Sequence, residues 1–107
     1  ILINGFLYTS GQIALDPETG KTQFESITEE TERVMKSLKA ILKEAGMVFS
    51  DVIKTTIYIS DMDNFSKINE IYGSYFDEET APARETVQVA RLPKDANVEI
   101  SLIAYKA

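Results

Sequence analysis

Residues 81–100 have the sequence APARETVQVARLPKDANVEI, and this stretch decides how the rest of the chain is interpreted. Its alternation of side chains predicts two strands separated by a short turn that contains Pro93. Arg84 falls at the start of the first strand, and Glu99 falls within the second. We predict that the two strands form a hairpin. A cation and a carboxylate would then lie in adjacent strands, at positions where an apolar pattern would not place them.

Turn and capping signals divide the first half of the chain. An Asn-Gly pair at residues 4–5 separates two short apolar runs, which predicts a β-hairpin. The segment DPETG at residues 16–20 predicts a turn, because proline presets φ and glycine accepts a positive φ. Residues 26–29 match a capping box, so a helix should begin there and end before Gly46.

Residues 52–59 are rich in β-branched side chains, which predicts a strand. One face of this strand should comprise Ile53, Thr55, Ile57 and Ile59. Asp61 should cap a second helix, while Asn64 and Asn69 are expected to be surface or capping residues. The buried stripe of this helix should comprise Phe65, Ile68, Tyr72 and Phe76.

These elements predict one α+β domain over residues 1–107, with two helices covering the apolar face of a sheet. Strand alternation predicts that the other face is mixed in character and carries Arg84, Thr86, Ser101, Ile103 and Tyr105. This second face is too apolar to be favourable in water, and we expect a subunit partner to cover it.

The composition narrows the possible chemistry. The chain has no cysteine and no histidine, which excludes thiolate nucleophiles, Ser-His triads and the commonest zinc ligand sets. With 17 acidic and 11 basic residues the net charge is -6, so nonspecific binding to nucleic-acid phosphates is not favoured. No apolar run could span a membrane and no signal peptide is evident, so we expect a cytoplasmic protein. The chain begins inside a predicted strand, and we expect a short N-terminal segment to precede it.

Four residues are candidates for a functional site. The planar fork of Arg84 matches a carboxylate, although a surface arginine paired with a nearby acid is the simpler alternative. Glu99 could orient or deprotonate a water, and its alternative is an exposed rim carboxylate. Ser10 and Gly11 end an early strand and could bind a polar substrate group, or they could serve only as turn residues.

Several short motifs then occur together: SGQI at residues 10–13, NExY at 69–72, APAR at 81–84 and ARLPKDA at 90–96 followed by VEI at 98–100. With Phe76, this combination resembles the Rid (YjgF-like) family of reactive-intermediate deaminases over nearly the whole chain. The resemblance implies a chorismate-mutase-like two-layer fold with a mixed sheet. It also implies a homotrimer whose open sheet faces meet around a central barrel, with three clefts between subunits.

The same resemblance implies hydrolysis of 2-iminobutanoate and 2-iminopropanoate to 2-oxo acids and ammonia, without a cofactor or a metal. By matching positions, Arg84 would bind the substrate carboxylate and Glu99 would position the attacking water. Ser10 would supply a hydroxyl to the cleft, with Gly11 as its backbone neighbour. Thr86 stands where many members carry cysteine, and its backbone would contact substrate. The family's upstream Gly-Pro-Tyr segment is absent from this chain, and Tyr8 does not replace its tyrosine.

Two other functions remain open from the sequence. A non-catalytic trimer that binds 2-oxo acids or a regulatory protein would use the same arginine without turnover. Ribonuclease activity is the less favoured alternative, because the chain is acidic and has no basic stripe.

Overall fold

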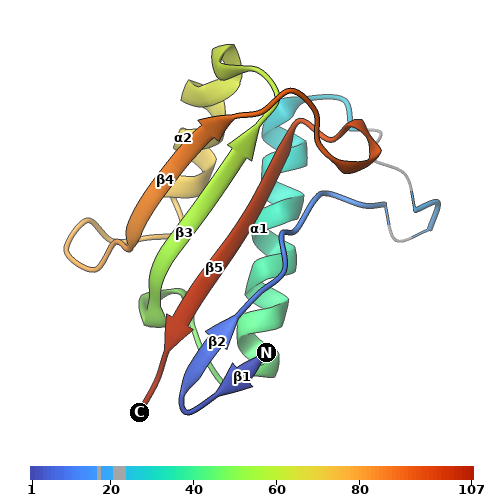
Figure 1. Cartoon of the computed structure of the whole chain (residues 1–107). Helices are drawn as coiled ribbons and strands as arrows, with labels where there is room; N and C mark the ends of the chain where they lie inside the picture. The colour runs from blue at the N-terminus through green and yellow to red at the C-terminus, as the bar shows by residue number, and fades with distance from the viewer. Residues whose placement is uncertain (17, 21–23) are drawn as a thin grey trace.

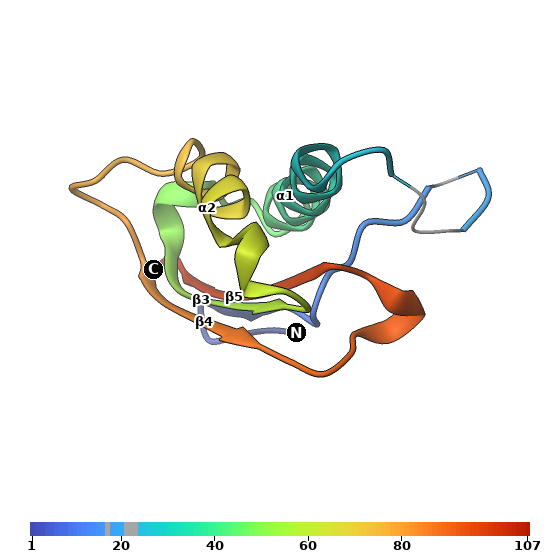
Figure 2. The ribbon, with the colours of Figure 1, turned by 90° about the horizontal axis from the view of Figure 1, so that it is seen from above.

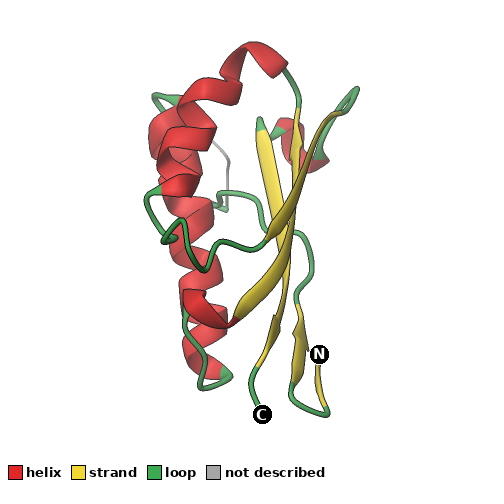
Figure 3. Ribbon diagram, turned by 90° about the vertical axis from the view of Figure 1, so that its left-hand side faces the viewer, coloured by secondary structure: helices red, strands yellow, loops and turns green. Residues whose placement is uncertain are grey.

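The computed structural model describes residues 1–16, 18–20 and 24–107 of the chain. Five strands form one sheet in the order β1-β2-β5-β3-β4, and two helices pack on one of its faces (Figures 1 and 2). Seen from the side, the helices make one layer and the sheet the other (Figure 3). The elements are β1 (Leu2–Ile3), β2 (Phe6–Tyr8), α1 (Ile27–Glu44), β3 (Val52–Ile59), α2 (Phe65–Gly73), β4 (Ala83–Gln88) and β5 (Val98–Tyr105). The predicted α+β class, with a mixed sheet and both helices on one face, is confirmed.

Local sequence signals determine the N-terminal hairpin and α1 as predicted. Asn4 and Gly5 both have positive φ, at 51° and 84°, as a two-residue type I′ turn requires. The Ser26 hydroxyl accepts a hydrogen bond from the Glu29 N–H at 3.1 Å and caps α1. The helix ends just before Gly46, whose φ is 72°.

The turn predicted at residues 16–20 is only partly described. Asp16 accepts two backbone hydrogen bonds, from the N–H of Glu18 to its side chain at 2.8 Å and from the N–H of Gly20 to its carbonyl at 2.7 Å. The positive φ of Gly20, 70°, confirms the role expected of the glycine. Pro17 lies outside the described residues.

The predicted hairpin between the last two strands is wrong. β3 lies between β4 and β5, pairing parallel with β4 and antiparallel with β5. Parallel neighbours need a crossover connection, and α2 supplies it between β3 and β4. β4 is therefore an edge strand, while β5 lies inside the sheet.

The core lies between the helices and the sheet. Ile57, Ile59, Val98 and Ile100 are fully buried there, against residues of α1 and α2. The buried face of β3 differs from the prediction at Ile53, which is 47% exposed. The reason is a shift in register with β5 between Val52 and Lys54, which turns Val52 inward instead. No helix within the described residues is long and apolar enough to cross a membrane.

Candidate active site

Arg84 lies on the face of the sheet that the helices cover. In the parallel register it is the partner of Thr55, and Thr86 is the partner of Ile57, and both of these β3 residues are fully buried. The prediction that Arg84 and Thr86 lie on the open face is therefore wrong. Val87 alternates with these residues and pairs with Tyr58, so it lies on the open face instead, where it is 43% exposed.

Three side chains of α2 hold the guanidinium of Arg84. Its Nη1 donates to Asn69 Oδ1 at 2.7 Å. Its Cζ lies 5.6 Å from the centroid of the Phe65 ring and 5.3 Å from that of Tyr72, within the range of cation–π attraction. These three residues are four and three positions apart, so they share one side of the helix. The result is a cation with a fixed position at an exposed edge.

No carboxylate pairs with Arg84 among the residues that the structure describes, where the ion pairs are Lys54–Glu85 and Arg91–Asp95. The alternative of a surface arginine neutralised by a nearby acid is thus wrong for that part of the chain. An amide oxygen orients the guanidinium without neutralising it. Its remaining donors stay available to a carboxylate ligand.

Tyr72, one of the two rings beside Arg84, is itself held in place by a buried hydrogen bond. Its hydroxyl and the Thr55 hydroxyl form a hydrogen bond of 2.6 Å in the buried core. Burial raises the pKa of the Tyr72 phenol, outweighing the Thr55 hydrogen bond and the charge of Arg84, which both lower it. The ring therefore stays neutral beside the cation, as an anchored wall of the site.

Thr86 brings a second polar group to the same face of β4. Its Oγ1 is buried and has no hydrogen-bond partner, and it is the one such side-chain nitrogen or oxygen within the described residues. The Val89 N–H points toward β3, because it donates to Ile59 O at 2.8 Å. The N–H direction alternates from residue to residue along a strand, so the N–H of Thr86, three positions earlier, points away from β3. The sheet therefore supplies a hydrogen-bond partner to neither the hydroxyl nor the backbone N–H of Thr86.

Glu99 lies on the opposite face of the sheet. Its register partner is Tyr58, and it alternates with the buried Val98 and Ile100. The half-buried side chain lies against the backbone of Gly11, where an added Cβ would come within 2.5 Å of both Glu99 Cδ and Oε2. The absent side chain of the glycine is what leaves room for this carboxylate. Two of the predicted site residues, Gly11 and Glu99, therefore lie side by side in one chain.

Ser10 lies next to this contact and is exposed. Beyond it, Gln12 forms an isolated antiparallel bridge and exchanges hydrogen bonds of 2.8 and 3.0 Å with the backbone of Ile100. Ser10 borders a cavity of about 350 Å³ whose wall comprises Ile1, Leu7, Tyr8, Thr9, Ser10, Gln12 and Ile41. Neither Arg84 nor Glu99 belongs to that wall, so the cavity does not unite the predicted site.

One chain therefore holds the predicted site residues as two candidate half-sites on opposite faces of the sheet. Arg84, Thr86 and the contacts from α2 make the first, and Glu99 with Gly11 makes the second. The sheet itself separates them, since β4 residues paired with Thr55 and Ile57 face the helices while Glu99, paired with Tyr58, faces away. Sequence reasoning missed Asn69, although its spacing from Phe65 and Tyr72 could have indicated it.

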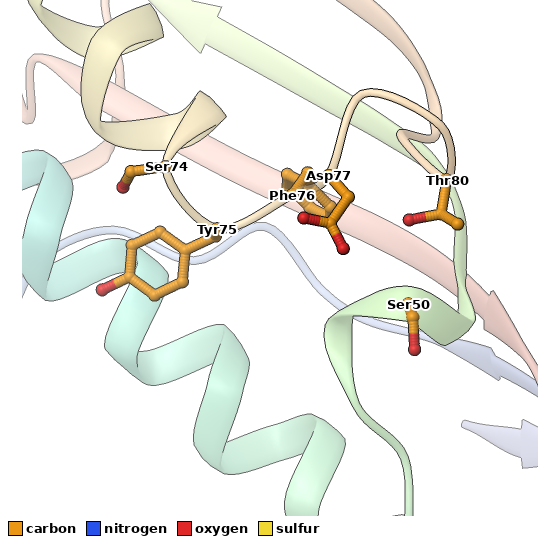
Figure 4. Close-up of a pocket in the computed structure, with 6 residues that line it drawn as sticks. All are labelled: Ser50, Ser74, Tyr75, Phe76, Asp77 and Thr80. Atoms are coloured by element: carbon orange, nitrogen blue, oxygen red, sulfur yellow. The ribbon is translucent and has the colours of Figure 1, made fainter.

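A separate pocket of about 120 Å³ lies beyond the end of α2 (Figure 4). It is lined by Ser50, Ser74, Tyr75, Phe76, Asp77 and Thr80. The Tyr75 hydroxyl donates to the Glu32 carboxylate, and burial together with this carboxylate raises the pKa of Tyr75 to about 12. The residues that line this pocket offer hydroxyls and a carboxylate but no cation. Arg84 is therefore better suited than this pocket to bind a carboxylate ligand.

Within the described residues no group of three or more acidic, histidine or cysteine side chains could hold a metal ion.

The chain is similar to known proteins over almost its whole length. The family model described as Endoribonuclease L-PSP matches residues 1–106. A RutC family protein of Synechocystis is 52% identical over 105 residues, which are 97% of this chain and 81% of that protein. The 2-iminobutanoate/2-iminopropanoate deaminase of Rattus norvegicus is 42% identical over 106 residues, or 99% and 77% of the two chains. The crystal structure of E. coli TdcF with bound serine is 39% identical, with a TM-score of 0.90 and coverage of 100% and 85%.

Proposed function

We propose that this chain, which belongs to the Endoribonuclease L-PSP family of RutC and reactive-intermediate-deaminase proteins, hydrolyses 2-imino acids to 2-oxo acids and ammonia. The proposed substrates are 2-iminobutanoate and 2-iminopropanoate, the compounds that the name of the rat relative states. The observation that carries the proposal is the unneutralised Arg84, fixed by Asn69 and two rings at the edge of the sheet. It is a preformed receptor for the carboxylate that every such substrate carries.

The chemistry needs orientation more than activation. An iminium carbon is already electrophilic, so binding the carboxylate to Arg84 and holding a water at C2 converts an encounter into an intramolecular reaction. Glu99 would take a proton from the attacking water as the C–O bond forms, giving a tetrahedral carbinolamine. The same carboxyl group would return that proton to nitrogen. As the C–N bond breaks and ammonia leaves, the Glu99 carboxylate would accept the proton of the carbinol hydroxyl while the C=O bond of the 2-oxo acid forms. No redox or metal step is required for this balance.

A complete site requires more than one copy of the chain. Since Arg84 and Glu99 lie on opposite faces, the two can serve one substrate only if they come from neighbouring subunits. The open face supports this arrangement, because it exposes Tyr8, Val87 and Tyr105 by 41–46%. We therefore propose a homotrimer in which the half-site of Arg84 and Thr86 on one subunit meets the Glu99, Gly11 and Ser10 of the next.

The test couples a threonine dehydratase reaction to trapping of the released imine with semicarbazide. The wild-type protein should accelerate formation of 2-oxobutanoate and suppress formation of the semicarbazone. Arg84→Ala should lower kcat/KM roughly 100-fold, as expected for the loss of charged hydrogen bonds to the carboxylate. Arg91→Ala is the matched control, since Arg91 is exposed and paired with Asp95. Equal activity of the Arg84→Ala and wild-type proteins would disprove the proposal.

Binding without catalysis is the second candidate. The Arg84 half-site is organised within one chain and does not need Glu99 to hold a carboxylate, and E. coli TdcF was solved with bound serine, which also carries one. Ordinary affinity for 2-oxobutanoate with no effect on imine hydrolysis would favour this function over deamination. Ribonuclease activity, to which the family description refers, is less favoured because the net charge is -6.

A further inference from the structure

Glu30 is a buried carboxylate that the proposed reaction does not use. It lies in the first turn of α1 and is 2% exposed. Its Oε2 accepts a hydrogen bond from the backbone N–H of Asn97 at 2.8 Å, and its Oε1 accepts one from Asn97 Nδ2 at 2.7 Å. No lysine or arginine forms an ion pair with it within the described residues. Burial of a carboxylate is costly unless it is hydrogen-bonded, and here both bonds come from one residue 67 positions away in the chain.

Asn97 is held from two sides. Besides the two bonds to Glu30, its carbonyl accepts from the Ser60 N–H at 3.1 Å, and its Oδ1 accepts from the Ser60 hydroxyl at 3.4 Å. Ser60 directly follows β3, so Asn97 joins the start of α1 to the end of β3. All four polar groups of Asn97 therefore have partners, and its neighbours Ala96 and Val98 are buried.

The chain bends at Asn97 and enters β5 at the next residue. The side chain of Asn97 reaches Glu30 on the helix side, whereas Glu99, two residues further on, faces the open side of the sheet. Two residues of a strand span roughly 7 Å, so a change in the bend displaces the Glu99 carboxylate directly. The contact between Glu30 and Asn97 therefore sets the direction in which the backbone carries Glu99.

The loop that precedes β5 depends on outside contacts for its shape. Lys94 and Asp95 have positive φ, at 55° and 56°, in the left-handed region that side chains disfavour. Such a conformation persists only where surrounding contacts hold it. The last register pair of β3 and β5 is Ile59 with Val98, so Glu99 is one residue from the end of this ladder. Because the ends of elements fray first, contacts beyond the sheet are needed to keep its position fixed.

We propose that Glu30 is a positioning residue for the reaction: by bonding to Asn97 it fixes the start of β5 and so aims the Glu99 carboxylate at the attacking water. The inference rests on the role proposed for Glu99. Gly11 leaves the room that this carboxylate occupies, and Glu30 fixes the backbone from which the side chain extends. Glu30 itself is buried on the helix side and does not contact the substrate.

The test compares kcat with ligand affinity in Glu30→Gln. This variant keeps the shape of the side chain but replaces one acceptor oxygen with an NH2 group, which then faces a donor of Asn97. We expect kcat for imine hydrolysis to fall about tenfold, because misplacing a catalytic group by about 1 Å costs up to about 100-fold. Calorimetric affinity for 2-oxobutanoate should stay within about twofold of wild type, because Arg84 is untouched. Asn97→Ala keeps the backbone bond to Glu30 and should lower kcat about threefold, which provides a second measurement if Glu30→Gln does not fold.

Two further variants separate positioning from stability. In the double variant Glu30→Gln with Asn97→Asp, the introduced amide donates to the introduced carboxylate and accepts from the backbone N–H, so kcat should recover to within about threefold of wild type. Leu42→Val is the matched control, because Leu42 is fully buried twelve residues further along α1, about 18 Å from Glu30. It should lower the melting temperature by opening space in the core and leave kcat unchanged.

Several results would overturn the inference while leaving the proposed function intact. Unchanged kcat in both Glu30→Gln and Asn97→Ala would limit Glu30 to a structural role. An equal loss of kcat in Leu42→Val would show that the reaction responds to stability rather than to the bend, and failure of the double variant to recover kcat would exclude Asn97 as the route. A rise in KM at constant kcat would assign Glu30 to binding. If the wild-type protein does not accelerate imine hydrolysis, the proposed function fails and this inference fails with it.

Discussion

The surroundings of Arg84 and Glu99 are built in opposite ways. Arg84 lies at the edge of the sheet, and its position depends on side chains that reach it from α2, namely Asn69 and two aromatic rings. Glu99 lies on a central strand, and its position depends on the absence of a side chain at Gly11. On the helix side of the sheet, side-chain contacts therefore position the charged group. On the open side, the room left by a glycine positions it. Substitutions should affect binding on the first side and the chemical step on the second.

The largest expected effect tests the open side directly. Glu99→Gln keeps the shape of the side chain but removes the proton acceptor, so kcat should fall roughly 100-fold or more. Affinity for 2-oxobutanoate should stay within about twofold of wild type, because Arg84 is untouched. Single-turnover kinetics with calorimetric binding checks both. A comparable loss of affinity would show that Glu99 also binds the ligand and would remove the contrast between the two faces.

Gly11→Ala should give a smaller effect of the same kind. The new Cβ would lie 2.5 Å from Glu99 Cδ, and the flexible carboxylate side chain must move to relieve the contact. We expect kcat to fall roughly tenfold, with a stability loss of about 1 kcal/mol or less in urea unfolding. Gly73→Ala is the matched control, since an added Cβ there meets nothing within 4 Å. Full activity of Gly11→Ala would mean that the position of Glu99 does not limit the reaction.

Asn69 tests the helix side. Asn69→Ala removes the hydrogen bond to Arg84 Nη1, so the guanidinium gains freedom and KM should rise about fivefold with little change in kcat. Asn69→Asp should have a larger effect on KM, because a carboxylate at this position would neutralise the cation that the substrate needs. Steady-state kinetics distinguishes the two variants. If kcat changes and KM does not, the helix side contributes to chemistry as well as binding.

The smallest effect on function should come from Tyr72→Phe. The ring beside Arg84 remains, but the Thr55 hydroxyl loses its buried partner, so unfolding free energy should fall by about 1–3 kcal/mol. Affinity for 2-oxobutanoate should be nearly unchanged. The double variant Tyr72→Phe with Thr55→Val should recover much of the lost stability, as measured by denaturant titration. A double variant less stable than the single one would contradict a role limited to this hydrogen bond.

The predictions from sequence succeeded where the signal was local. The turn at residues 4–5, the cap at Ser26 and the strand that became β5 all depend on neighbouring residues, and all are confirmed. The hairpin of β4 and β5 was wrong because strand alternation does not specify which strands pair. β3 lies between them because the crossover through α2 brings β4 back parallel to β3. The alternating pattern of residues 81–100 contains no information about this crossover.

The sequence indicated candidate site residues but not how they are placed, for the same reason. Arg84 and Glu99 stood out as charges in strands, but the faces that they occupy could not be assigned together, since the face of β4 depends on its partner strand. Asn69 was missed because a single half-buried amide on a helix has no distinctive pattern by itself. Thr86 was predicted to contact substrate through its backbone, but its unpaired hydroxyl became visible only in three dimensions.

The sequence by itself determined the chemistry available to this protein and most of its local structure. Without histidine or cysteine, the chain can offer an arginine, a carboxylate and hydroxyls to a ligand, and turn and cap residues act over a few positions. Only the tertiary structure decided that the arginine and the carboxylate lie on opposite faces, and that α2 orients one of them. The physical reason is that side-chain direction in a strand has a period of two, but which face is buried depends on packing between elements distant in the chain.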